Sequence, residues 1–167
     1  RQRQMCIRDR CWSHSYPMGA VRFTRGEVMS HQAVAHLENR CYQEWLPMQV
    51  QPDLLIGVGG TLTTLAAMDL QLAVYDAEKV EGHRVSYDAL CGHIERLQAM
   101  TPEERRHVPG LQPKRSDIIV AGLLIAKSFL QRYHIPAITV SERDLMEGVF
   151  FRHSFHDAAW NSRDRQS

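Results

Sequence analysis

The chain has 167 residues, of which 44% are hydrophobic and 23% charged, values typical of one globular domain. Such a length can bury a core without disulfides or a structural metal. The longest apolar run, 118–126, is too short to span a membrane. No charged segment followed by an apolar stretch opens the chain, so no secretory signal is expected. Together with four cysteines that show no C-x-x-C spacing, these features predict a cytoplasmic protein with no membrane partner.

The first ten residues look foreign to the rest of the chain. Residues 1–10 (RQRQMCIRDR) read like one translated frame of a transposon-end adapter used in DNA sequencing, and we expect them to be an artefact. They contain four basic residues and one acidic residue. Without them 16 basic residues stand against 18 acidic ones, which turns the net charge from +1 to −2. A nucleic-acid-binding surface needs a basic excess, so no nucleic-acid partner is expected. A natural basic arm is the alternative for these ten residues.

The spacing of apolar residues predicts strands and helices in alternation along the chain. Ser86 is expected to cap a helix that runs to Leu97, and Thr101-Pro102-Glu103-Glu104 forms a capping box with proline at the first helical position. Residues after Asp76 show no regular pattern and are expected to form a surface excursion. Three strands are predicted, at 18–24, 54–58 and 136–140, and the other helices are predicted at 28–45, 61–72, 116–133 and 142–151. This alternation favours an α/β fold with a partly parallel sheet flanked by helices.

A glycine-rich turn joins the predicted strand at 54–58 to the helix that follows. In Gly57-Val58-Gly59-Gly60-Thr61, glycines let the backbone approach a ligand closely, and the free N–H groups at the helix start favour an anion such as phosphate. Thr61 adds a hydroxyl or caps the helix. A tight turn without a ligand is the plain alternative. A dinucleotide-binding loop is a weaker one, because Leu62 stands where that motif needs its third glycine, although Asp76 has the spacing of a ribose-binding acid.

Arg115 is a second candidate phosphate contact. It follows Lys114 and comes just before the predicted buried helix, and its planar guanidinium suits phosphate oxygens. The alternative is a solvated Lys-Arg pair. No catalytic residue and no metal ligand can be assigned from spacing alone. The predicted phosphate- or nucleotide-binding residues are therefore Gly59, Gly60, Thr61 and Arg115.

Four motifs in order resemble the exopolyphosphatase/guanosine pentaphosphate phosphatase family (Ppx/GppA), and the segment 75–83 resembles its connecting segment. The motifs are SYPMGAVR at 15–22, IGVGGTLTTLA at 56–66, LQPKRSDIIVAG at 111–122 and VSERDLMEGV at 140–149. The resemblance implies a ribonuclease H-like, actin-like ATPase fold of two α/β halves with phosphate between them. Residues 11–152 would then be part of the second half, truncated at the N-terminal side, and 153–167 a polar tail.

The resemblance also implies a function. Family members hydrolyse the terminal phosphate of polyphosphate or the 5′-phosphate of guanosine pentaphosphate, usually with Mg²⁺, and a homodimer is expected for the intact enzyme. The family's water-activating glutamate and its main phosphate loops have no counterpart in this sequence. We therefore expect a fragment of an exopolyphosphatase that is inactive alone. A guanosine pentaphosphate phosphohydrolase and a non-catalytic nucleotide-sensing or interaction module are the alternatives.

The family's strand order, 3-2-1-4-5, predicts how the strands pair. Residues 18–24 would be strand three, 54–58 strand four and 136–140 strand five. Strands four and five should therefore be parallel neighbours, with the helix at 116–133 as their crossover. Strand three, without its usual partner, should be unpaired or should dock on strand four, and the exposed apolar faces should leave the chain weakly stable and prone to associate.

Overall fold

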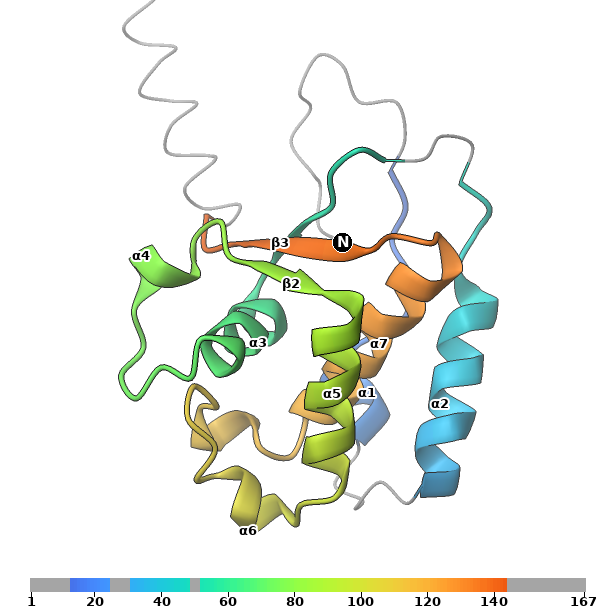
Figure 1. Cartoon of the computed structure of the whole chain (residues 1–167). Helices are drawn as coiled ribbons and strands as arrows, with labels where there is room; N and C mark the ends of the chain where they lie inside the picture. Colours follow the sequence, from blue (N-terminus) through green and yellow to red (C-terminus); the bar gives the residue numbers. More distant parts are fainter. Residues whose placement is uncertain (1–12, 25–30, 49–51, 144–167) are drawn as a thin grey trace, which may run out of the picture. The chain divides into compact units, whose positions relative to one another are not determined.

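The computed structural model describes residues 13–24, 31–48 and 52–143, and Ser15–Glu142 form one compact unit. It contains a mixed sheet with the order β1-β3-β2, made of β1 (Ile56–Val58), β2 (Arg84–Ser86) and β3 (Ala137–Ser141). Helices α3, α5 and α7 lie together on one side of this sheet (Figure 1). The predicted α/β class, with helices flanking a partly parallel sheet, is confirmed.

The parallel pairing of the second and third predicted strands is also confirmed. β1 and β3 run parallel, with Gly57 opposite Val140. β2 pairs antiparallel with the other edge of β3 and places Val85 opposite Ile138. The sequence reading missed β2, because a three-residue strand with one buried side chain has no measurable alternation. β3 is therefore the middle strand, and the excursion expected after Asp76 contributes to the sheet.

The strand predicted at 18–24 is wrong. The segment Ala20–Thr24 is a short helix, α1, in which the Phe23 N–H bonds the Gly19 carbonyl and the Thr24 hydroxyl bonds the Ala20 carbonyl. No described strand pairs with this segment, so a helix is the conformation that satisfies its backbone groups locally. The alternating apolar residues Met18 and Phe23 still pack against the core.

The predicted helices that fall within the described residues are present, and two of them, α5 and α6, begin at the expected caps. The Ser86 hydroxyl accepts the Ala89 N–H, and Thr101 and Glu104 form the predicted capping box. The predicted helix at 142–151 lies almost entirely outside the described residues, and Ser141 ends β3. The helices are α2 (His31–Glu44), α3 (Gly60–Asp69), α4 (Ala77–Val80), α5 (Tyr87–Gln98), α6 (Pro102–Arg105), the 3₁₀ turn η1 (Pro113–Arg115) and α7 (Ile119–Arg132).

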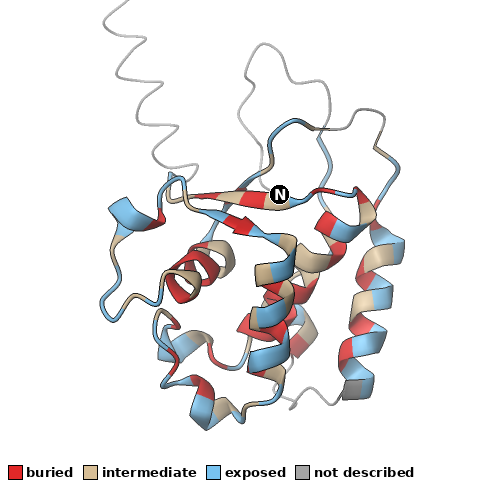
Figure 2. Cartoon of the chain, in the orientation of Figure 1, coloured by how far each residue is buried: buried red, intermediate tan, exposed pale blue. Residues whose placement is uncertain are grey.

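Helix α7 is the centre of the core. Its first half is buried on all sides, as its uninterrupted apolar sequence predicts, and α1, α2, α3 and α5 all contact it. Figure 2 shows the buried residues where these helices face one another. A row of edge-to-face aromatic contacts joins the segment after α2 to α7. It runs from Tyr16 through Trp45 and Phe129 to Tyr133. The Trp45 indole N–H also bonds the Ser128 hydroxyl at 3.0 Å.

The two faces of the sheet differ in burial. Val85, Ile138 and Val140 are buried on the helix side. On β1, Ile56 and Val58 keep 57% and 51% of their surface exposed, as does Leu54 before the strand at 61%. An apolar face is therefore open at this edge, as predicted. None of the described helices is long and apolar enough to cross a membrane.

Gly110 fixes the loop between α6 and η1 against α3. Its φ of +81° lies in the left-handed region, and a Cβ at this position would overlap the backbone of Ala67. Val108 and Leu111, on either side of the turn, are buried. The loop is thus docked on α3 by backbone contact, which any side chain at residue 110 would prevent.

Gly110→Ala should lower the free energy of unfolding by at least about 2 kcal/mol, from the positive φ and from the overlap together. Gly92→Ala is the matched control. Gly92 lies in α5, where an added Cβ meets nothing within 4 Å, so alanine there should stabilise the chain by up to about 1 kcal/mol. Urea unfolding measures both. Equal effects would contradict the docking of this loop.

A carboxylate joins three elements beside the sheet. Asp69, at the end of α3, accepts from His83 Nε2 at 2.7 Å and from His93 Nε2 at 3.0 Å. His83 comes just before β2, and His93 lies in α5. Partial burial raises the pKa of Asp69, but the two histidine hydrogen bonds outweigh it and hold the pKa below 3.8. The ionised carboxylate therefore stabilises the fold.

Because the folded pKa of Asp69 is lowered, its contribution is present above pH 3.8 and is lost as the pH falls through the folded value. Asp69→Asn should cost about 1.5–3 kcal/mol near neutral pH. The difference from the parent chain should shrink in acid below about pH 3.8. Glu95→Gln, an exposed change on α5, is the control. Unfolding curves measured above and below this pH give the free energies of unfolding. If the difference between Asp69→Asn and the parent chain did not change with pH, the stabilising role of the ionised Asp69 carboxylate would be contradicted.

Candidate functional site

The turn between β1 and α3 has a backbone that only glycine adopts readily. Gly59 has φ 94° and ψ 163° and is the residue before the first turn of α3. It offers no side chain to cap the helix. The first N–H groups of a helix have no acceptor within the helix. The start of α3 is therefore an uncapped helix end with its partial positive charge directed at the turn.

Gly57 is needed for close packing at this turn. A Cβ there would meet the side chains of Leu62 and Ile138. Leu62, the residue that breaks the dinucleotide-binding motif, thus covers Gly57. Asp76, the candidate ribose ligand, instead caps α4 by accepting the Glu78 and Lys79 N–H groups and pairs with the Lys79 ammonium at 3.2 Å. The dinucleotide-binding alternative therefore has no support in the structure.

Arg115 lies against this turn, about 55 residues further along the chain. A Cβ placed on Gly60 would overlap the guanidinium of Arg115, so the two are in direct contact. Lys114, by contrast, is exposed, and Arg115 is half-buried. The structure brings together the residues that the sequence singled out, Gly59, Gly60, Thr61 and Arg115. Arg115 is thus less exposed than Lys114, and its guanidinium contacts the backbone of Gly60.

The 3₁₀ turn η1 holds Arg115 in place. Its Nε–H donates to the Gln112 side-chain oxygen at 3.0 Å, and its backbone N–H donates to the Gln112 carbonyl at 2.8 Å. The buried Ser116 hydroxyl donates to the Pro113 carbonyl at 2.9 Å. Sequence reasoning missed Gln112 and Ser116, although the three-residue spacing from Gln112 to Arg115 fits contact within one helical turn.

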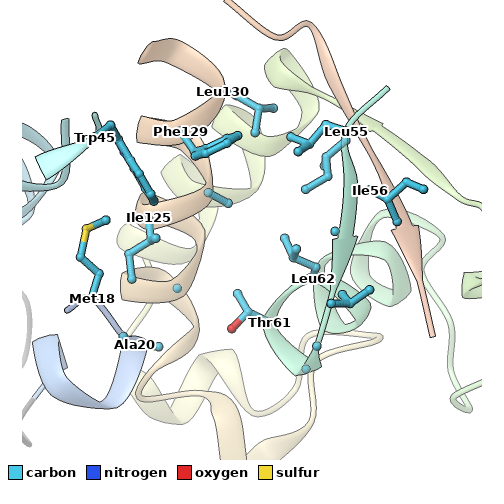
Figure 3. A pocket seen from close by; sticks show the side chains of 18 residues that line it. Met18, Ala20, Trp45, Leu55, Ile56, Thr61, Leu62, Ile125, Phe129 and Leu130 are labelled. Carbon is cyan, nitrogen blue, oxygen red and sulfur yellow. The ribbon is translucent and has the colours of Figure 1, made fainter. Parts of the chain in front are cut away.

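A pocket of about 490 Å³ opens beside the turn, between β1 and α7. Gly59, Gly60 and Thr61 form its polar end. In Figure 3, Trp45, Ile125 and Phe129 line one side of the pocket and Leu55 and Leu62 the other. Most of the lining is apolar and no acidic residue belongs to it. Arg115 contacts Gly60 at this end but is not among the residues that line the pocket.

The residues around the turn do not fit a magnesium site. Mg²⁺ takes oxygen ligands, usually carboxylates, whereas a guanidinium and one hydroxyl are the polar side chains at this turn. Within the described part of the chain, no group of three His, Cys, Asp or Glu side chains could hold a metal ion. The magnesium ion implied by the family resemblance stays a prediction.

The Ppx/GppA phosphatase family matches residues 9–155. The chain belongs to this family. Exopolyphosphatase 2 of Mycobacterium tuberculosis is 33% identical over 98 residues, which are 56% of this chain and 31% of that protein. The structure of the Aquifex aeolicus PPX-GPPA enzyme superposes with a TM-score of 0.75 at 26% identity, over 81% of this chain and 47% of that one.

An exopolyphosphatase from Cytophaga hutchinsonii gives a TM-score of 0.72 at 26% identity, over 84% of this chain and 49% of that one. These likenesses confirm the actin-like fold of the Ppx/GppA family. The chain spans less than half the length of each of these relatives.

Gly60→Ala should displace the Arg115 guanidinium in this Ppx/GppA chain, because the new Cβ would occupy its position. The far end of a flexible side chain can move, so the free energy of unfolding should change by less than about 1 kcal/mol. Gly19→Ala, where an added Cβ meets nothing within 4 Å, is the control. The NMR resonance of the Arg115 Nε–H reports the displacement. An unshifted resonance in Gly60→Ala would show that the two residues are not in contact.

Proposed function

We propose that this chain forms the phosphate-holding part of an enzyme that releases terminal phosphate from inorganic polyphosphate. The observation that carries the proposal is the contact of Arg115 with Gly60 at the uncapped start of α3. A guanidinium and free helix N–H groups are two donors suited to phosphate oxygens. Family membership and two relatives named exopolyphosphatase support polyphosphate as the substrate.

The reaction needs positioning and charge neutralisation more than covalent chemistry by the protein. Water adds to the terminal phosphorus and the bridging P–O bond breaks. The products are orthophosphate and a polyphosphate that is one phosphate shorter. Arg115 and the α3 N–H groups would hold phosphate oxygens and offset the charge that develops on them. A carboxylate that removes a proton from the water is also required, and no acidic residue lines the pocket. We therefore propose that the chain alone binds polyphosphate and does not hydrolyse it.

The alternatives of a guanosine pentaphosphate phosphatase and of a nucleotide-sensing module share this phosphate site. Their distinguishing feature would be a site for the nucleoside, and no observation assigns one. The homodimer expected from the family resemblance stays a prediction, as does a cytoplasmic location.

Arg115→Ala should weaken tripolyphosphate binding by the chain about tenfold or more, since charge-assisted hydrogen bonds contribute about 1.5–3 kcal/mol. Arg106→Ala is the matched control, because Arg106 is exposed and pairs with Glu103 at 2.9 Å on the surface of α6. Calorimetric titration measures both affinities, and a phosphate-release assay on the same samples should give no turnover. Equal affinities for the two variants would reduce Arg115 to a surface residue, and release of phosphate would refute the binding-only role.

A further inference from the structure

Arg105 is a buried cation with no carboxylate within salt-bridge distance among the described residues, although the charge of Asp117 acts on it from further away. Only 7% of its surface is exposed, and it forms no salt bridge in the part of the chain that the structure describes. Burial lowers its pKa and the Asp117 charge raises it, and the guanidinium stays charged at neutral pH. A buried charge is costly unless hydrogen bonds compensate it. The hydrogen-bond partners of the Arg105 guanidinium therefore indicate what this residue does.

Those partners are two backbone carbonyls from separate parts of the chain. The Arg105 Nε–H donates to the Leu97 carbonyl at 2.7 Å, and an Nη1–H donates to the Ser116 carbonyl at 3.4 Å. Leu97 lies in the last turn of α5, where the partial negative charge of the helix end attracts a cation, and its carbonyl also accepts the Met100 N–H at 3.3 Å. Ser116, which is fully buried, immediately follows Arg115. One guanidinium thus ties the end of α5 to the turn that carries Arg115.

We propose that Arg105 is a positioning residue that holds the η1 turn so that Arg115 lies at Gly60 and can bind phosphate. The inference rests on the proposed phosphate site and adds a residue to it. The chain of contacts runs from the Leu97 carbonyl through Arg105 to the Ser116 carbonyl, and from η1 through Arg115 to Gly60. A planar guanidinium with several N–H donors can bond both carbonyls at once, whereas an ammonium on a flexible stem holds them less well.

A double-mutant cycle on tripolyphosphate affinity tests this role. Arg105→Met removes the donors and keeps a long apolar side chain, and it should weaken binding about three- to tenfold in the parent chain. If Arg105 acts through Arg115, the same substitution should have no further effect in the Arg115→Ala background. Arg105→Lys should recover part of the affinity. Arg106→Met, at the exposed neighbouring residue, is the control and should change nothing.

Thermal unfolding confirms that each variant is folded, and Arg105→Lys replaces Arg105→Met in the cycle if the latter does not fold. An equal loss of affinity in both backgrounds, or no loss in a folded variant, would overturn the proposal. If the parent chain does not bind tripolyphosphate, the proposed function fails. The NMR resonance of the Arg115 Nε–H then tests whether Arg105 positions Arg115. A resonance that shifts in the Arg105 variants supports positioning, and an unshifted one overturns it.

Discussion

The close approach of Arg115 to the backbone of Gly60 is the contact on which the site depends. It is possible because residue 60 has no Cβ and because Gly59 takes a backbone conformation that directs the chain from β1 into α3. The contact places a fixed positive charge beside uncapped helix N–H groups. Two features that are ordinary by themselves thereby become one surface suited to an anion.

The rest of the fold fixes the positions of the glycine turn and of Arg115 relative to each other. The parallel pairing of β1 with β3 fixes the strand that leads into the glycine turn. Three residues separate the end of η1 from the buried helix α7, so the packing of the first half of α7 fixes where the Arg115 turn lies. Gly110, docked on α3, and Arg105, bonded to the end of α5, hold the loop between α6 and η1 from two sides. The site is thus positioned by core packing, although its own residues lie in turns.

Features that depend on local interactions were the ones most predictable from the sequence. Caps such as Ser86 and Thr101 were predictable because their hydrogen bonds are local, and helix α7 was predictable because its apolar run is long. The segment at 18–24 has the alternation of a strand but forms α1, since its conformation depends on a pairing partner that no local pattern supplies. β2 was missed because three residues with one buried side chain show no alternation. The glycine turn and Arg115 were found by residue type, whereas Arg105 was not, because neither its burial nor its carbonyl partners leave a sequence pattern.

Titration of the ¹⁵N-labelled chain with tripolyphosphate, followed by NMR, tests most directly whether the glycine turn and Arg115 form one phosphate-binding site. The account predicts that the Gly60 and Thr61 amides and the Arg115 Nε–H shift together, with one dissociation constant, while resonances of the exposed α6 residues stay in place. Shifts confined to other basic residues, or separate dissociation constants for the turn and for Arg115, would contradict it.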